Sequence, residues 1–324
     1  NGNLNTSGSN YIYIAIRRPH KPPEAGTDVF AIDTKSVSSA NTPSYSANFP
    51  VDLAIRRNNI TSTDSNEWCT RITNSLLYSN ATSAEVDGGS TFLDYFAFNN
   101  GWATATSADS TDYLWMLKRA AGFFDIVAYT GGISGSPASV THNLDAVPEL
   151  MIIKKRNFTQ SWWVYHSALG NAGRLILSSN TNATTGSTDW GSTTPTSSVF
   201  YIGDNTNDGG GSTYIAYLFA TLAGISKVGS YTGTGSNINV DCGFTAGARL
   251  VLIKRSDSNG DWYVWDSTRG IVSGNDPYIL LNTTAAQVTS TDYLDPLNAG
   301  FTVTSSAPAA LNTSGGTYLF LAIA

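Results

Sequence analysis

The sequence is poor in charged residues and has no long apolar run, and each shortage excludes a class of protein. Only 13% of the 324 residues are charged, and the formal net charge is −6. A nucleic-acid-binding protein needs a concentrated basic face, because neutralising phosphates releases counterions. The sequence therefore argues against a nucleic-acid partner. A membrane-spanning helix needs roughly 20 apolar residues in a row, and no run approaches that length, so no membrane partner is expected.

Cysteine and histidine are also scarce, which argues against the sites that these residues usually build. Cys69 and Cys242 lie far apart in unlike contexts and indicate neither a disulfide framework nor a zinc site. The sequence has no HExxH, CxxC, Gly-x-Ser-x-Gly or phosphate-binding glycine motif. We therefore expect no cofactor and no enzymatic activity.

Aromatic and turn-forming residues, by contrast, are abundant. The chain holds 8 Trp, 16 Tyr, 13 Phe and 30 Gly. Short runs rich in Thr, Tyr, Trp, Val and Ile alternate with clusters of Gly, Asn and Ser, which is typical of strands joined by tight turns. There is no long amphipathic helix pattern. The sequence predicts an all-β fold of antiparallel strands.

The chain repeats itself with a period of about a hundred residues, as tandem-repeat proteins do. The segment YTG at 129–131 returns at 231–233, and WWVYHSALG at 162–170 returns as WYVWDSTRG at 262–270. A third, looser copy comes first, with VDLAIRR at 51–57 in the place of MIIKK at 151–155. We expect three β-sandwich domains in a row, tandem and jelly-roll-like, of about a hundred residues each.

The repeat sets the expected domain boundaries. The expected segments are 1–18, a closing strand or N-terminal arm; 19–122, a diverged sandwich repeat; 123–226, a sandwich repeat; and 227–324, a C-terminal sandwich repeat. The first segment contains TSGSNYIYIAIRRP at 6–19, which resembles a closing strand without a body before it. It is either the tail of an earlier repeat in a longer polypeptide or a strand added to a later sheet, as in a closed ring.

Basic residues follow the apolar runs in small groups. They are Arg17-Arg18, Arg56-Arg57, Lys154-Lys155-Arg156 and Lys254-Arg255. We interpret each group as the point where a strand enters solvent. The alternative is a contact with phosphate or with a sulfated glycan.

Two acidic turns are weak calcium candidates. Asp204 and Asp208 lie in DNTNDG, and Asp257 and Asp261 lie in DSNGD. A calcium-binding hand loop would place a glutamate eleven positions after its first aspartate, but Ile215 stands there. The other interpretation is a plain hairpin turn in each case.

The aromatic strands offer candidates for ligand stacking. Because side chains alternate along a strand, Trp163 and Tyr165 share one face, as do Tyr263 and Trp265. These pairs could stack on a sugar, or they could pack between two sheets.

Catalysis has weaker candidates. A glycan hydrolase needs two opposed carboxylates, and folding could bring Asp266, Asp292 and Asp295 together. His166 aligns with Asp266 in the next copy, and a catalytic base that changes identity between copies is a poor candidate.

The assembled unit resembles a family of uncharacterised repeats in tail and structural proteins of bacteriophages, often marine ones. It runs YTG, a strand ending in Lys or Arg, W-x-V-x-D-S, LLNTT-A, GF and a GGTY-type closing strand. The resemblance is good over 123–324 and partial over 11–122. It implies a virion protein located on the extracellular particle: a tail fibre or spike that binds a host glycan or protein, with a capsid decoration or head fibre protein as the alternative and a glycan depolymerase as the second alternative. The implied partners are copies of the chain, with a trimer as one option, and other virion proteins.

Overall fold

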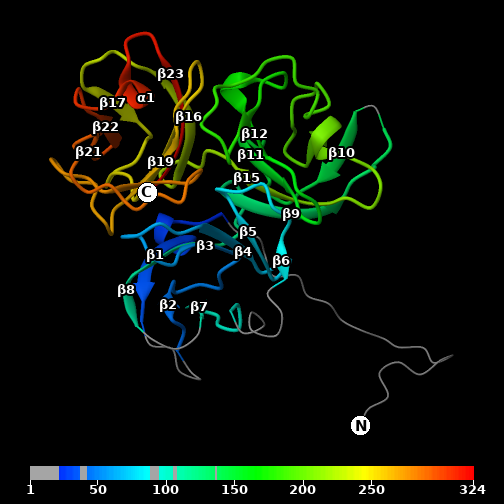
Figure 1. Cartoon of the computed structure of the whole chain (residues 1–324), viewed down its shortest axis with the longest axis horizontal. Coiled ribbons are helices and arrows are strands. Elements are labelled where there is room, and N and C mark those ends of the chain that lie inside the picture. Colours follow the sequence, from blue (N-terminus) through cyan, green and yellow to red (C-terminus); the bar gives the residue numbers. More distant parts are fainter. Residues whose placement is uncertain (1–21, 37–41, 88–94, 105–107, 136) are drawn as a thin grey trace.

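Strands make up most of the structure, a computed structural model that describes residues 22–36, 42–87, 95–104, 108–135 and 137–324 (Figure 1). Every pairing between the described strands is antiparallel. The predicted all-β fold is confirmed. None of the described helices is long and apolar enough to span a membrane. The helical pieces among the described residues are η1 (Gly26–Asp28), η3 (Ser167–Leu169), η4 (Asp204–Thr206) and α1 (Ala309–Asn312).

Three large sheets share one strand order, and each is formed by one stretch of the chain, named here unit 1 (22–118), unit 2 (119–220) and unit 3 (221–324). In each sheet the unit's last strand lies between its first strand and its central strand. Unit 1 has the order β1 (Phe30–Lys35), β8 (Asp109–Leu117), β3 (Leu53–Arg57), β4 (Asn66–Thr70), β5 (Ser75–Tyr78), β6 (Val86–Asp87). Unit 2 has β9 (Phe124–Thr130), β15 (Thr213–Phe219), β11 (Leu150–Lys155), β12 (Trp162–His166), β13 (Leu175–Ile176). Unit 3 has β16 (Ser226–Thr232), β23 (Thr317–Ile323), β18 (Leu250–Arg255), β19 (Trp262–Asp266), β20 (Tyr278–Leu280).

A small second sheet covers one face of each large sheet and encloses a private core. In unit 2, for example, Phe200 of the small sheet and Met151 of the large sheet belong to one buried cluster. Units 1 and 3 have corresponding clusters. Each unit is therefore a two-sheet sandwich. The small sheets are β2 (Tyr45–Ser46) with β7 (Gly101–Trp102), β10 (Ala138–Thr141) with β14 (Val199–Ile202), and β17 (Ile238–Asp241) with β22 (Gly300–Val303) and β21 (Leu294–Leu297).

The other face of every large sheet points into a single core that the three units share. Along β12, Trp163 and Tyr165 belong to the private cluster, whereas Trp162 and Val164 belong to the shared one, as the period of two requires. The shared cluster draws buried residues from all three units. The three sandwiches, which follow one another along the chain, thus surround a common centre (Figure 1).

Unit 1 meets unit 3 close to the last residue of the chain. A Cβ on Gly26 would lie 1.9 Å from the Ala324 carbonyl oxygen, so only glycine fits there. Arg249 donates from Nη1 to the Phe30 carbonyl at 3.0 Å, and its guanidinium lies over the Phe30 ring. These contacts join unit 3 to unit 1, and the arrangement is a ring. The predicted closing strand within 6–19 lies outside the described residues.

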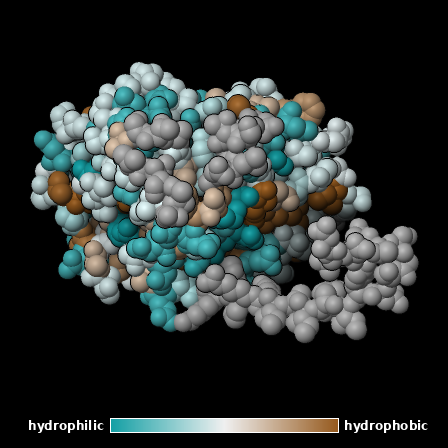
Figure 2. All heavy atoms as spheres, turned by 90° about the horizontal axis from the view of Figure 1, so that it is seen from below, coloured by the Kyte–Doolittle hydropathy of each residue, from teal (hydrophilic) through white to brown (hydrophobic). Residues whose placement is uncertain are grey.

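Few large apolar side chains among the described residues are exposed. On the face that Figure 2 shows, hydrophilic and intermediate residues predominate and the apolar patches are small and separate. Exposed large hydrophobic side chains in the described ranges are scattered singly, at Ile72, Val86, Val147, Phe158 and Val272. Single exposed residues of this kind are normal on a protein surface. Most of the large apolar side chains are therefore buried in the shared core and the three private cores.

Candidate functional site

Basic residues at the ends of the central strands are buried where one unit meets the next. Arg57, Lys154 and Lys254 take equivalent places in β3, β11 and β18, and each is at most 1% exposed. The interpretation of strands that enter solvent is therefore wrong for these three residues. Each donates to an equivalent carbonyl of a neighbouring unit: Arg57 Nη2 to Thr284 at 2.7 Å, Lys154 Nζ to Thr82 at 3.3 Å and Lys254 Nζ to Asn180 at 3.4 Å.

Burial has an electrostatic cost that these contacts offset. Burial lowers the pKa of Lys154 and that of Lys254 to about 8 each. Each ammonium also donates to the carbonyl of the next residue, at 2.7 Å in both units. A buried charge with such donors satisfied is tolerated. These cations act as ties between units and are closed to an external phosphate or sulfate.

A second equivalent tie lies beside each cation. The indole Nε1 of Trp162 donates to the Tyr78 carbonyl, and that of Trp262 donates to the Ile176 carbonyl, both at 3.0 Å. Unit 1 has Asn66 at this place, and its Nδ2 donates to the equivalent Leu280 carbonyl at 3.0 Å. All three contacts of the ring therefore repeat one pattern.

The aromatic pairs predicted to stack on a ligand are enclosed in the private cores. Trp163 and Tyr263 are each 8% exposed, Tyr165 is 3% exposed and Trp265 is 0% exposed. A stacking platform needs an open ring face, so the stacking prediction is wrong for these four side chains. The physical reason is that both faces of each large sheet are covered, one by the small sheet and the other by the shared core.

The four acids predicted as weak calcium ligands are held by separate partners. Asp208 pairs with Lys155 at 2.5 Å, and Asp257 pairs with Arg255 at 3.0 Å. Asp261 accepts from Asn282 Nδ2 at 2.7 Å, and Asp204 accepts from the Thr188 hydroxyl. Across the described ranges, no three His, Cys, Asp or Glu side chains gather closely enough to hold a metal ion. The fold therefore does not bring these carboxylates into one site.

Of the three carboxylates considered for hydrolysis, Asp292 and Asp295 are half-buried, whereas Asp266 is closed to a substrate. Asp266 is fully buried, pairs with Arg269 at 2.5 Å and accepts from the Trp115 indole of unit 1 at 3.1 Å. It is a tie between units 3 and 1. Asp276, which the sequence did not single out, is also fully buried, and burial raises its pKa to about 7, with the charge of Asp292 adding to the rise. A substrate cannot reach either group.

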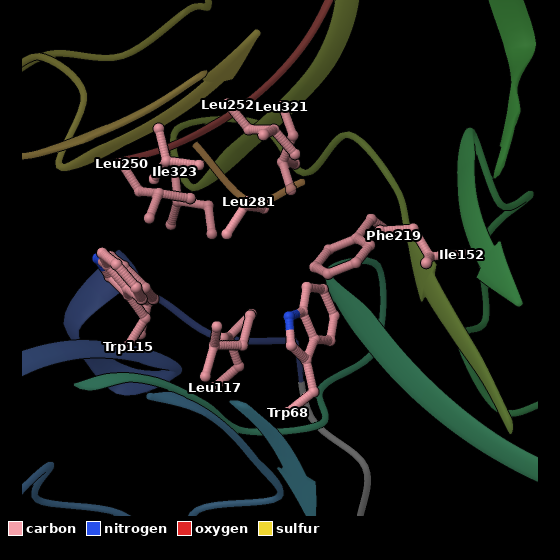
Figure 3. Close-up of a pocket in the computed structure, with 13 residues that line it drawn as sticks. Trp68, Trp115, Leu117, Ile152, Phe219, Leu250, Leu252, Leu281, Leu321 and Ile323 are labelled. Atoms are coloured by element: carbon pink, nitrogen blue, oxygen red, sulfur yellow. The ribbon is translucent and has the colours of Figure 1, made fainter. Parts of the chain in front are cut away.

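An apolar cavity of about 40 Å³ lies inside the shared core (Figure 3). Trp68 and Trp115 of unit 1, Phe219 of unit 2, and Leu252 and Leu321 of unit 3 point toward it. Cavities lined in this way stay dry, and ligand pockets are usually several hundred Å³. We interpret it as a packing gap at the centre of the ring.

A larger hollow of about 390 Å³ opens on the side of unit 3, between β16 and β17. Among the described strands, β16 pairs only with β23 and β17 pairs only with β22. The hollow is thus the gap between the two sheets at the open side of the sandwich. We call it the unit 3 groove, and its lining includes Lys227, Gly229, Ser230, Tyr231, Asn239, Val240, Asp241 and Phe320.

One exchange of side chains distinguishes this side of unit 3 from unit 2. In unit 2, Val127 pairs with Ala216, and at the equivalent place in unit 3 Gly229 pairs with Phe320. A Cβ on Gly229 would lie 2.6 Å from the Phe320 ring. The bulk therefore moves from the edge strand to the strand beside it. The sequence carried this signal, because aligning DIVAYTG with KVGSYTG puts a glycine inside a strand, where a close approach is expected.

Comparison with known families places most of the chain in one family. A family model described as "Domain of unknown function (DUF7483)" matches residues 116–324. The match begins at the end of β8 and includes all of units 2 and 3, with the unit 3 groove. No curated protein matches the chain.

Proposed function

The chain belongs to this family of unknown function, and we propose that it is a non-enzymatic structural protein of a bacteriophage particle, a tail fibre or spike that attaches to the host surface. The proposal rests on what recurs among the three units. A building block that keeps its architecture and varies its polar groups serves shape and attachment rather than chemistry.

The observation that carries the proposal is a contrast between two equivalent positions. The position of Lys154 holds a buried cation in every unit. The position of His166 holds Thr70 in unit 1 and Asp266 in unit 3. The buried cation that ties the units together thus recurs, and the residue that could act as a base does not. This pattern supports a structural role.

The ring supports an extracellular location in a further way. The chain buries four aromatic-rich cores under a surface that carries few charges. Its strands are short and linked by tight turns. Proteases cleave exposed, locally unfolded segments, and a ring closed by interunit ties has less freedom to open. A particle outside the cell benefits from such resistance.

A capsid decoration protein is the second candidate, and the threefold arrangement favours it. Three equivalent sandwiches around one centre match the threefold positions that closed capsids contain. A single chain would then provide the three sandwiches that three copies of a smaller protein would otherwise provide at such a position. Whether copies of the chain associate further, as a trimer or otherwise, remains a prediction.

Imaging of the assembled particle separates the two candidates. Cryo-electron microscopy of particles labelled with antibody fragments against the chain should place it on the tail or on a fibre. Purified protein should also bind the host bacterium and compete with particle adsorption. Density at threefold positions of the head together with no binding to cells would support the decoration role instead, and a location inside the cell would contradict both.

A further inference from the structure

We propose that unit 3 binds a calcium ion between the side chains of Asp276 and Asp292. Asp276 lies in the segment that leads into β20, and Asp292 lies in the segment that leads into β21. The ion would hold these two segments together, wherever the chain is located on a particle. The family description assigns no metal to the chain.

Three side-chain oxygens of these segments are buried without a hydrogen-bond partner among the described residues. They are Asp276 Oδ2, Asp292 Oδ1 and Thr291 Oγ1. Asp276 is 0% exposed as a whole residue. Buried polar atoms in folded proteins nearly always have a partner. A group of three unpartnered oxygens therefore points to a ligand that binds oxygen.

Backbone hydrogen bonds place the carboxylate of Asp276 beside Asp292. The Asp276 N–H donates to the Thr291 carbonyl at 2.7 Å. The Tyr293 N–H donates to Asp276 Oδ1 at 2.9 Å. The two bonds engage the residues immediately before and after Asp292, so the two acids lie close together. Because Oδ1 is held by the backbone, Oδ2 is the oxygen that faces a ligand.

Unit 2 neutralises a buried carboxylate in the same part of its sandwich with a cation of its own. Asp189 is 0% exposed, and its Oδ2 accepts from Arg174 Nη1 and from the Ser187 hydroxyl, both at 2.6 Å. Its Oδ1 accepts from Asn205 Nδ2 at 2.8 Å. Every oxygen of this carboxylate is therefore satisfied by the chain itself.

Unit 3 lacks the arginine that unit 2 uses. The isolated bridge between Arg174 and Thr184 corresponds to the bridge between Tyr278 and Val288, so an uncharged tyrosine stands at the place of the arginine. Among the described residues, Asp276 forms no ion pair. The buried carboxylate of unit 3 thus has no cation from the chain to balance it.

The difference appears in the pKa values of the two carboxyl groups. Burial raises the pKa of Asp276 to about 7, and the charge of Asp292 adds to the rise. Burial acts in the same direction on Asp189, but hydrogen bonds from Ser187 and Arg174 outweigh it and lower the pKa of that group. An unbalanced buried charge is unfavourable. A bound cation would do for Asp276 what the arginine does for Asp189.

Two carboxylates suit calcium better than other common cations. Calcium takes oxygen ligands in a flexible geometry and accepts carbonyls and waters beside carboxylates, whereas magnesium demands a nearly ideal octahedron. Zinc prefers nitrogen and sulfur. Fewer than three acidic side chains therefore suffice. Asp292 is half-buried, and the neighbouring Asn275 and Ser290 are exposed, so a small ion can enter from solvent and water can complete its shell.

Calorimetric titration of calcium chloride into the full chain tests the proposal. The chain is first freed of metal with EDTA and is titrated at pH 8, where Asp276 is mostly ionised. We expect one ion per chain with a dissociation constant of about 10⁻⁴ M. Calcium at about 100 times that concentration should raise the melting temperature by about 4 °C. Magnesium chloride should bind roughly tenfold more weakly.

Two variants give unit 3 the residues that unit 2 has at the same places. Counted from the equivalent bridges, Asp276→Ala matches Ala172 and Asp292→Thr matches Thr188. Because both residues already pack in this fold, we expect both variants to fold and to bind calcium roughly tenfold more weakly or worse. Asp257→Asn is the control, because it removes an acid from another turn of unit 3, and it should leave calcium binding unchanged.

A third variant separates a metal ligand from a merely structural acid. Asp276→Asn keeps an oxygen for the Tyr293 N–H and removes the charge. In EDTA at pH 8 it should melt at a higher temperature than the unaltered chain, because an unbalanced buried charge is gone. In calcium the order should reverse, since only the unaltered chain gains from the ion.

Any of four results would overturn the proposal. They are no heat and no melting shift with calcium at pH 8, equal calcium binding by the unaltered chain and by both Asp276→Ala and Asp292→Thr, loss of binding in Asp257→Asn, and magnesium binding as tight as that of calcium. The first result would mean that the folded chain keeps Asp276 protonated. None of them bears on attachment to host cells, which is measured separately.

Discussion

Units 2 and 3 have the same strand order and the same register in their large sheets, yet they treat the gap between their sheets differently. Val127 packs against the private core of unit 2, whereas Gly229 at that place in unit 3 leaves the edge strand bare above Phe320. Positions that face other units vary less: Lys154 and Lys254 make equivalent contacts, as do Trp162 and Trp262. The sides that face away from the ring are thus where a binding surface can differ between units.

Unit 1 shows how far an interunit position can change while its contact survives. Asn66 replaces the tryptophan, and its Nδ2 still donates to Leu280. The aromatic bulk returns elsewhere in the same sheet, because Trp68 and Trp115 of unit 1 take the places of Val164 and Tyr217 of unit 2. The hydrogen bond and the volume are therefore separable requirements of the ring.

The largest effect should come from breaking this shared core. Trp262→Ala should lower the free energy of unfolding by about 3–5 kcal/mol, because it removes a buried indole and leaves the Ile176 carbonyl without its donor. Trp162→Ala should cost a similar amount. Asn66→Ala should cost about 1–3 kcal/mol, because its amide donates to carbonyls of unit 3 and accepts from Arg57. Urea denaturation measures all three. A loss below about 1 kcal/mol for either tryptophan would mean that the units are stable without one another.

The internal repeat explains which parts of the fold and of the candidate site could be predicted from the sequence. The matched strings gave the strands, and alternation along WWVYH correctly separated Trp163 and Tyr165 from Trp162 and Val164. The matched strings could not show that both faces of each large sheet are buried. A strand with two covered faces and a strand with one exposed face can have the same period of two. The stacking prediction failed because the small sheet of the same unit covers that face. The interpretation of the basic residues failed because a neighbouring unit covers the other face. The groove depends on Gly229 and Phe320, which come together only through strand register.

The next effect compares His166 with its counterpart Thr70. His166 is 2% exposed, and burial lowers its pKa to about 4, with nearby carbonyls of Phe320 and Gly229 opposing the shift. Because the folded-state pKa is depressed, its contribution is complete above the unfolded value near 6.5 and is lost as the pH falls through the folded value. We expect a loss of about 3 kcal/mol between pH 7 and pH 4 from this residue.

The control for this pH effect is the residue that unit 1 has at the same place. His166→Thr removes the titrating ring, so its unfolding free energy should depend less on pH over the same interval. Urea midpoints at pH 7, 5.5 and 4.5 measure the slopes. Parallel slopes for the variant and the unaltered chain would show that His166 does not couple folding to protons.

An intermediate effect concerns the exchange that shapes the groove. Gly229→Val alone places a side chain against the Phe320 ring and should cost about 1–3 kcal/mol through overpacking. Adding Phe320→Ala restores the combination of unit 2 and should recover part of that cost, so the two changes should not add. A double-mutant cycle by urea denaturation measures the coupling. If the two changes in unfolding free energy add exactly, the side chains at positions 229 and 320 do not compete for the same space.

The smallest expected change in stability concerns the packing at the centre of the ring, which we expect to be looser on the unit 3 side. Val264 lines the cavity of about 40 Å³, whereas its counterpart Val164 lines a gap of only about 10 Å³. Val264→Ile adds a methylene where there is room and should raise the free energy of unfolding by about 0.5 kcal/mol. Val164→Ile adds the same group where there is little room and should lower it by about 1 kcal/mol. Thermal melts of the two variants should shift in opposite directions. A shift of the same sign in both would mean that the three sandwiches can move to absorb the added volume, and that the gap is not a fixed feature of the ring.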